Sequence, residues 1–413
     1  MRLTSSLQPS RLLIQSARYQ QSYKATPTSR FQRGFKTATA SQPSVPDFAF
    51  AFDIDGVLVR SSKPLPGASE SLSLLQNQKI PFILLTNGGG KYETERAADL
   101  SKTLGVDLGP GSIIQSHTPF MELVRGNGKQ GSLQDKCVLV VGGEGDKCRQ
   151  VAERYGFRSV VTPGDILLAH PEISPFSNVS AEHYKEFTRP LPRPADNNHT
   201  PSNLKIDAVL VFNDSRDWAL DIQVIIDVLL SSQGVLGTYS DKNHRNDLPN
   251  RGFQQDGQPP IYFSNPDLWW AAAYHLPRLG QGGFREALEG AWEATTRGTG
   301  ECMKLQKSII GKPYQETYEF AEKRLLSNRA EMLGEKALEP LRNVYMVGDN
   351  PESDIRGANS YVSESKVGWE SILVRSGVYN GGEPKYKPRT IVDGVRDAVQ
   401  WGLDRSGWNG SKE

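Results

Sequence analysis

The sequence has no apolar stretch long enough to cross a membrane. Its apolar runs fall well short of the roughly 20 residues that a spanning helix needs, in a chain of 413 residues that is 37% hydrophobic and 23% charged. Cysteine is scarce, and the three present, Cys137, Cys148 and Cys302, have no regular spacing. Such a set provides neither a disulfide framework nor a zinc site. We therefore expect no transmembrane segment and a reducing compartment.

Histidines at metal-binding intervals are missing too. The six histidines are His117, His170, His183, His199, His244 and His275. Metal-binding histidines recur at short intervals, and no two of these are close in the sequence. We interpret them as structural or surface residues.

Acidic residues are absent from the first 46 positions, which hold seven basic residues. The segment is rich in serine and lacks the apolar centre of a secretory signal, a composition typical of mitochondrial transit peptides. We predict that residues 1–46 are a disordered mitochondrial transit segment and that the protein resides in the mitochondrial matrix. A disordered basic tail is the alternative. Without these seven, 41 basic residues face 47 acidic ones, a net charge of −6, so no nucleic-acid binding is expected.

Apolar runs alternate with helical segments along the rest of the chain. Strands are predicted at 48–59 (ending in a glycine turn), 81–86, 137–141, 159–161, 206–212, 261–263, 343–347, 370–374 and 390–392. Helices are predicted at 67–78, 91–104, 145–156, 219–231, 314–329 and 393–403. This alternation is typical of a parallel sheet with helices on both faces, so we predict an α/β fold. Five prolines within 174–204 predict an exposed insertion there.

The first chemical signal is Asp53-Ile54-Asp55-Gly56, directly after a predicted strand. Two carboxylates at this spacing share one side of an extended segment, and the glycine allows a sharp turn. One carboxylate can attack a phosphoryl group, while the other protonates a leaving alkoxide and later deprotonates water. An ordinary acidic turn is the alternative.

Two further signals suit an anion. Thr86-Asn87-Gly88-Gly89-Gly90 joins a strand to a helix, where a hydroxyl, an amide and bare backbone N–H groups can bind phosphate. A capped turn has the same composition. Gly311-Lys312-Pro313 places a cation before a helix. That lysine can neutralise a phosphoryl group or lie on the surface.

The fourth signal is Gly348-Asp349, with Asp354 five residues later. Asp349 can hold Mg²⁺, which prefers oxygen ligands, and Asp354 can orient its waters or Lys312. A loop of turn-forming residues is the alternative. These signals follow predicted parallel strands, and ligands of open α/β sheets bind at that edge.

Taken in order, the motifs Asp-x-Asp, Thr, Lys and Gly-Asp-(x)₄-Asp resemble the haloacid dehalogenase (HAD) superfamily of hydrolases. The long interval between Thr86 and Lys312 is similar to class II members, which insert a cap there. Asn265-Pro266-Asp267 resembles subclass IIA, whose cap is a small α/β domain. The triple glycine and the N-terminal segment look most like the eukaryotic mitochondrial branch that includes the cat eye syndrome critical region hydrolase.

The resemblance implies a domain organisation. A Rossmann-like core with a parallel sheet is expected at 47–110 and 262–413, and an inserted C2-type α/β cap at 111–261. Within the cap, Gly142-Gly143-Glu144-Gly145 lacks the spacing of a nucleotide loop and predicts a turn. Trp269 and Trp270 are predicted to pack in the core, with substrate stacking as the alternative.

The resemblance also implies a Mg²⁺-dependent phosphatase acting on a small phosphorylated molecule. Asp53 is then the nucleophile and Asp55 the general acid and base. The phosphate-binding residues it implies are Thr86, Asn87, Gly88 and Lys312. The implied metal ligands are Asp53, the backbone carbonyl of Asp55, and Asp349, with Asp354 just outside them and Asp267 a further candidate.

Two other functions are compatible with the motifs. One is a HAD-fold binding or assembly protein in mitochondria, and the other is an enzyme of mitochondrial glycerophospholipid biosynthesis. The motifs leave the substrate and the oligomeric state open.

Overall fold

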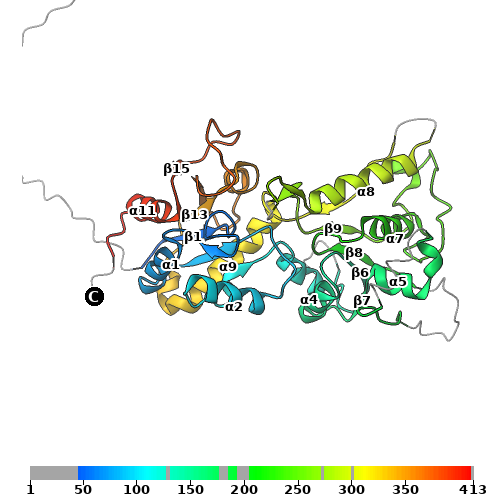
Figure 1. Ribbon diagram of the computed structural model, residues 1–413, viewed down its shortest axis with the longest axis horizontal. Coiled ribbons are helices and arrows are strands. Elements are labelled where there is room, and N and C mark those ends of the chain that lie inside the picture. Colours follow the sequence, from blue (N-terminus) through cyan, green and yellow to red (C-terminus); the bar gives the residue numbers. More distant parts are fainter. Residues whose placement is uncertain are drawn as a thin grey trace, which may run out of the picture. The chain divides into compact units, whose positions relative to one another are not determined.

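The computed structural model describes residues 45–126, 131–175, 185–192, 204–270, 274–298 and 302–410 (Figure 1). The chain divides into two units, 1–41 and 42–413, and the description below concerns the second. The predicted transit segment lies outside the described residues except for its last two positions, and so does most of the predicted insertion at 174–204. No helix of the described ranges is both long enough and apolar enough to cross a bilayer.

A six-stranded parallel sheet forms the first layer of the fold. Its strands, in spatial order, are β15 (Thr390–Val392), β14 (Gly368–Val374), β13 (Asn343–Gly348), β1 (Phe48–Phe52), β4 (Phe82–Leu85) and β5 (Ile113–Ile114). Every pairing in it is parallel. The predicted α/β class is therefore confirmed, and strands that are neighbours here come from both ends of the chain.

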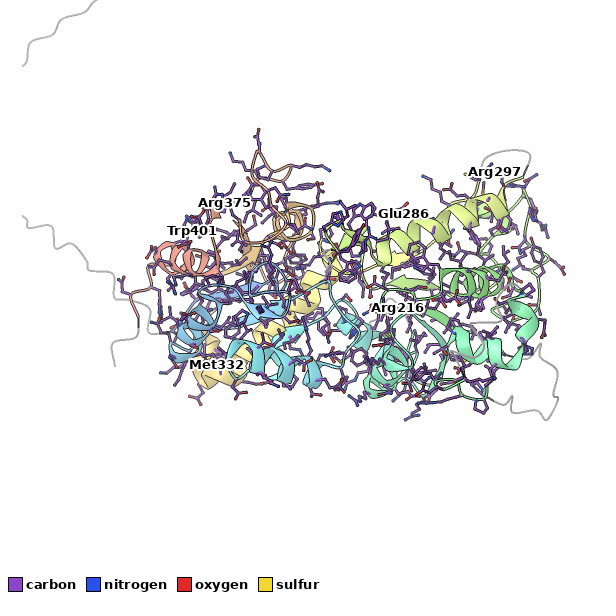
Figure 2. The ribbon with its side chains drawn as sticks, in the orientation of Figure 1. Arg216, Glu286, Arg297, Met332, Arg375 and Trp401 are labelled. Carbon is purple, nitrogen blue, oxygen red and sulfur yellow. The ribbon has the colours of Figure 1, made fainter. Side chains whose placement is uncertain are left out.

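Helices cover both faces of this sheet, so β1 is buried on both sides. Its three phenylalanines face α1 (Ala68–Asn77), α2 (Glu93–Leu104) and α11 (Val395–Arg405). Its two alanines face α9 (Gln315–Leu333) and α10 (Arg356–Ser360). Trp401 of α11, labelled in Figure 2, packs against Tyr345 of β13 with ring centroids 5.8 Å apart. A continuous apolar strand is what such a doubly covered position needs.

A second parallel sheet has five strands. In spatial order they are β12 (Ser308–Ile309), β9 (Ile261–Phe263), β8 (Ala208–Val211), β6 (Cys137–Val141) and β7 (Ser159–Val161). One face packs on α5 (Pro163–Ala169), α7 (Trp218–Leu230) and α8 (Gln281–Thr296). The other face packs on α3 (Met121–Arg125) and α4 (Lys147–Tyr155).

The second sheet extends further along the chain than the predicted cap of 111–261. β9 pairs with β8 on one side and β12 on the other, and α8 packs on the same sheet. The five-stranded layer therefore includes strands up to residue 309, beyond the boundary predicted at residues 261 and 262. An apolar strand shows that it is buried, not which of two sheets it joins. We propose that the inserted domain ends near residue 310.

Short elements complete the described ranges. They are the antiparallel pairs β2 (Val59–Arg60) with β3 (Lys63–Pro64) and β10 (Trp269–Trp270) with β11 (Arg278–Leu279), the 3₁₀ turns η1 (Pro110–Ser112), η2 (Thr118–Phe120), η3 (Pro171–Ile173), η5 (Pro249–Gly252) and η6 (Gly334–Leu338), and the π turn η7 (Pro351–Ile355). Trp269 and Trp270 are 55% and 49% exposed. Their predicted core packing is therefore wrong, because they belong to a two-stranded hairpin outside both packed sheets.

Asp221 on α7 is a buried carboxyl in the five-stranded layer. Burial raises its pKa to about 7, with Ser215 opposing the rise and Asp217 adding to it. An unfolded chain has an aspartate pKa of about 4. Between these values the folded protein keeps a proton that the unfolded chain has lost, so this group makes folding less favourable as the pH rises.

We expect Asp221→Asn to raise the melting temperature at pH 8 and to change it little at pH 4. The amide resembles the protonated carboxyl and removes a penalty of about 2–4 kcal/mol that exists only at the higher pH. Thermal unfolding at both pH values measures the effect. Asp393→Asn, at a side chain that is 86% exposed, is the control. An equal shift at the two pH values would contradict the assignment.

Candidate active site

Three of the predicted motifs follow strands that are neighbours in the six-stranded sheet. Asp53 follows β1, Thr86 follows β4 and Asp349 follows β13, and these strands lie in the order β13-β1-β4. The Asp53 N–H extends the pairing by donating to the carbonyl of Val347 at 2.9 Å. The carboxyl ends of parallel strands share one edge of a sheet, so the fold brings these segments to one place.

Three carboxylates converge at this edge. One oxygen from each of Asp53, Asp349 and Asp354 lies within 4.8 Å of the others, and all three residues are buried. Two glycines make room for them. A Cβ atom on Gly56 or on Gly377 would overlap the Asp349 carboxylate, and Gly56 also has φ +89°, which other residues rarely adopt.

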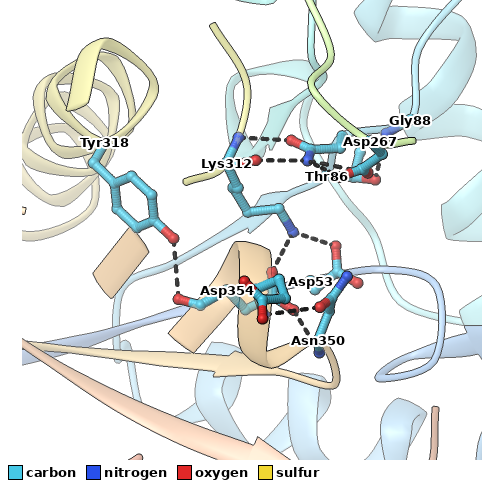
Figure 3. A network of polar contacts seen from close by, with 10 residues as sticks. Asp53, Thr86, Gly88, Asp267, Lys312, Tyr318, Asn350 and Asp354 are labelled. Carbon is cyan, nitrogen blue, oxygen red and sulfur yellow. Dashed lines mark hydrogen bonds and ion pairs between the residues drawn. The ribbon is translucent and has the colours of Figure 1, made fainter. Parts of the chain in front are cut away.

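Lys312, in the loop after β12, contacts two of the three carboxylates, those of Asp53 and Asp354 (Figure 3). Its Nζ lies 2.5 Å from Asp53 Oδ1 and 2.7 Å from Asp354 Oδ1, and its side chain is 2% exposed. When all are ionised, three carboxylates and one ammonium have a net charge of −2. Buried charge of that size is costly without further compensation. The residues therefore fit a divalent cation such as Mg²⁺, which prefers oxygen ligands.

Burial and repulsion shift the pKa values of these groups. Burial raises the pKa of Asp53 well above its ordinary value; Lys312 opposes the rise, and Asp354 and Asp349 add to it. Burial, followed by repulsion from Asp354, raises the pKa of Asp349 to about 7. Burial alone would lower the pKa of Lys312, but Asp354 and Asp53 hold it above the ordinary value. The lysine therefore stays charged at neutral pH.

Asn87 holds the backbone of Lys312 in place. Its side-chain oxygen accepts the Lys312 N–H at 2.7 Å, and its amide donates to the Lys312 carbonyl at 2.9 Å. The same amide donates to both oxygens of the Asp267 carboxylate at 3.1 Å. Burial raises the pKa of Asp267 to about 6, although the hydrogen bond from Asn87 acts to lower it. The side chain of Asn87 thus contacts both the loop after β9 and the loop after β12.

Thr86, Gly88 and Asp55 have different surroundings. Thr86 is buried, and its Oγ1 accepts the Gly88 N–H at 3.0 Å. Asp55 is exposed and forms a backbone bridge with Val59. Its carboxylate is not one of the three that converge.

The structure places the predicted residues as follows. Asp53, Lys312, Asp349 and Asp354 form one cluster. Asp354 was expected just outside the ligand set, yet its carboxylate is one of the three that converge, and its second oxygen accepts the Asn350 N–H at 3.0 Å.

The loop after β14 contributes contacts that the sequence did not predict. The Val378 N–H donates to Asp349 Oδ2 at 2.7 Å, and Ser376 Oγ donates to the Gly56 carbonyl at 2.6 Å. From α9, the Tyr318 hydroxyl donates to the Asp354 carbonyl at 3.2 Å. The Ser376-Gly377 turn after a strand was visible in the sequence, but its relevance depends on β14 pairing with β13.

Family models match both ends of the described chain. The model for haloacid dehalogenase-like hydrolases matches residues 50–158, and a HAD-hydrolase-like model matches residues 309–398. Together they include every residue predicted for the site except Asp267. They leave out most of the five-stranded sheet.

Two fungal proteins are similar over most of the chain. The mitochondrial hydrolase YKR070W of Saccharomyces cerevisiae is 43% identical over 86% of this chain and 96% of its own length. A cardiolipin synthase (CMP-forming) and mitochondrial hydrolase fusion protein of Schizosaccharomyces pombe is 39% identical over 90% of this chain. This chain covers 56% of that fusion protein.

Solved structures share the fold at low identity. A hypothetical protein from Pyrococcus horikoshii has a TM-score of 0.53 at 20% identity, covering 86% of this chain and 99% of that one. The p-nitrophenyl phosphatase from Archaeoglobus fulgidus has a TM-score of 0.51 at 16% identity, with coverages of 86% and 99%. The combination of a parallel core sheet and an inserted α/β layer is therefore found in other proteins.

Proposed function

Since the chain belongs to the haloacid dehalogenase-like hydrolases, we propose that it is a Mg²⁺-dependent phosphatase that hydrolyses a phosphate monoester of a small molecule. The observation that carries the proposal is the convergence of the Asp53, Asp349 and Asp354 carboxylates, with the Lys312 ammonium paired to those of Asp53 and Asp354. A carboxylate nucleophile repels a phosphate dianion, and this arrangement provides positive charge next to the nucleophile.

In the first step Asp53 attacks the phosphorus, and the bond to the leaving oxygen breaks. Asp55 gives its proton to that oxygen, so the alcohol leaves neutral and Asp53 carries the phosphoryl group. In the second step Asp55 takes a proton from a water that attacks the same phosphorus. Orthophosphate leaves, and the Asp53 carboxylate is restored. The exposed position of Asp55 allows it to meet both alcohol and water.

Asp53, Asp349 and the backbone carbonyl of Asp55 would hold Mg²⁺. When bound, the cation neutralises charge on the carboxylates and on the transferring phosphoryl group. Lys312 supplies the other positive charge, and two hydrogen bonds between the Asn87 side chain and the Lys312 backbone fix its position. Thr86 would supply a hydroxyl, and the backbone of Asn87 and Gly88 N–H groups, for the phosphate oxygens.

We expect Mg²⁺ to raise the melting temperature of the wild-type protein. A ligand that binds the folded state at about 100 times its dissociation constant stabilises it by about 2.7 kcal/mol. Thermal unfolding against increasing MgCl₂ measures the effect. Asp349→Asn should lose most of the shift, while Asp393→Asn should keep it. A shift of the same size in Asp349→Asn would remove this residue from the metal site.

The experiment that tests the function is a phosphate-release screen. The purified protein, with Mg²⁺ or with a chelator, is given a generic aryl phosphate and a panel of phosphorylated metabolites. Release of orthophosphate that requires Mg²⁺ is expected. A well-folded protein that releases none from any compound would contradict the proposal and favour a binding or assembly role for the same fold.

Two finer features rest on the fungal relatives. Their names support a mitochondrial location, for which residues 1–46 would be the targeting segment. The fusion to a cardiolipin synthase in one of them favours a second candidate substrate, a phosphate ester of glycerophospholipid synthesis. Including glycerol-based phosphate esters in the metabolite panel distinguishes it from a general metabolite phosphatase.

A further inference from the structure

His117 is a fully buried histidine that the proposed reaction does not use. It lies in the segment that leads from β5 into the five-stranded layer. Its Nε2 is 3.0 Å from the backbone nitrogen of Gly90, and its Nδ1 is 2.8 Å from the Tyr155 hydroxyl. The Tyr155 hydroxyl in turn donates to Glu93 Oε1 at 2.5 Å. A chain of three hydrogen bonds therefore connects the glycine loop to a carboxylate.

The direction of these hydrogen bonds is fixed by their ends. The Gly90 N–H can only donate, so His117 Nε2 must accept and carries no proton. Its Nδ1–H then donates to the tyrosine oxygen, and the Tyr155 proton points to the Glu93 carboxylate. Burial lowers the pKa of His117 to about 3, which keeps the ring neutral. Burial and the nearby Glu93 raise the pKa of Tyr155 well above its ordinary value, which keeps the hydroxyl protonated.

The first hydrogen bond is made to the loop expected to bind phosphate. The Ser116 N–H adds a second bond to this loop by donating to the Gly88 carbonyl at 3.2 Å. Gly89 lies so close to the histidine that a Cβ atom there would be 2.7 Å from His117 Cδ2 and 2.8 Å from Ser116 Oγ. Gly89 is thus required by the close approach of His117 and Ser116, and the imidazole accepts the Gly90 N–H and so sets its direction.

The last two residues in this series of hydrogen bonds, Tyr155 and Glu93, come from different layers. Tyr155 ends α4 of the five-stranded layer, while Glu93 begins α2 of the six-stranded layer. The Thr118 hydroxyl also donates to Glu93 Oε1, at 2.7 Å. The hydrogen bond from the half-buried Tyr155 to the buried Glu93 exists only while α4 stays next to α2. Hydrogen bonds of buried groups are costly to leave unmade, so the position of α4 and the order of the loop depend on each other.

We propose that His117 and Tyr155 are positioning residues that fix the phosphate-binding loop. Through them, the order of the loop depends on the position of the inserted domain, with α4 packed against α2. This rests on the proposed phosphatase function for its kinetic consequence, but not for its structural one. Neither residue reacts with substrate. They act through Gly90, by holding its N–H and the neighbouring loop in one orientation.

Tyr155→Phe tests the proposal with the removal of one oxygen atom. The ring keeps its contacts with Tyr92 and Phe212, while His117 loses its acceptor and Glu93 a donor. We expect kcat/KM to fall about tenfold, since the loss of one buried hydrogen-bond partner has an effect of that order. We also expect hydrogen exchange of peptides covering residues 87–92 to become about tenfold faster, as the order of the loop is lost.

Tyr239→Phe is a matched control. That tyrosine bonds a histidine as well, His244, at 2.9 Å, but on the exposed surface. It should leave exchange of the loop and kcat/KM unchanged. His117→Gln, whose side-chain oxygen can replace Nε2 as acceptor, should retain more of both properties than His117→Leu.

The outcomes separate this proposal from the function. If Tyr155→Phe lowers the melting temperature but leaves hydrogen exchange of the loop and kcat/KM at wild-type values, the three hydrogen bonds only stabilise the fold and the proposal is overturned. If the wild type releases no phosphate, the proposed phosphatase function is rejected, and hydrogen exchange still decides whether the three hydrogen bonds order the loop.

Discussion

The Asp53→Asn protein is expected to release phosphate at least about 10⁴ times more slowly than the wild type, since losses of that size follow when a nucleophile is removed. An amide cannot form the phosphorylated intermediate, and the Lys312 ammonium lies 2.5 Å from the Asp53 carboxylate that this amide replaces. Phosphate release under single-turnover and steady-state conditions measures the loss.

This loss should occur without unfolding. Asparagine has the shape of aspartate, and Lys312 keeps its ion pair with Asp354 at 2.7 Å. The variant should therefore melt close to the wild type. Asp227→Asn, at a half-buried carboxyl of α7 bonded to Gln223, should keep full activity. Activity above a tenth of wild type in a folded Asp53→Asn protein would reject Asp53 as the nucleophile.

Lys312→Met should lower kcat/KM by more than about 100-fold, the usual effect of removing a preorganised charge from a transition state. It leaves three carboxylates within 4.8 Å with no ammonium beside them, so a phosphate dianion is repelled. Breaking a buried ion pair also destabilises a fold by about 3–5 kcal/mol, so a lower melting temperature is expected. Steady-state kinetics and thermal unfolding measure the two effects.

The metal dependence distinguishes this lysine from a purely structural one. Without the ammonium the site is more negative, and the variant should bind Mg²⁺ more tightly than the wild type, as measured by thermal shift against MgCl₂. Lys323→Met removes an exposed lysine of α9 that pairs with Glu122 and should change neither activity nor Mg²⁺ affinity. Weaker Mg²⁺ binding in Lys312→Met would show that the lysine does not oppose the cation's charge.

Most of the secondary structure around the site could be predicted from local sequence. Apolar runs that stop at a polar residue predicted β1, β4 and β13, and the candidate residues Asp53, Thr86 and Asp349 follow these strands directly. α8 (Gln281–Thr296) was not predicted. Its first turn contains Gly282 and Gly283, which are poor helix formers. A Cβ on Gly282 would lie close to the backbone of Asp267, so glycine is required there by a contact that only the folded chain reveals.

The amino-acid sequence by itself determined which side chains can take part in a reaction and where the buried strands end, because side-chain type and apolar periodicity are local properties. The tertiary structure decided the rest. It brought Lys312 to Asp53 across 259 positions, assigned β9 and β12 to the second sheet, exposed Trp269 and Trp270, and gave His117 its partners. These outcomes depend on pairing and packing between distant segments, and local patterns record that a residue is buried but not what it is buried against.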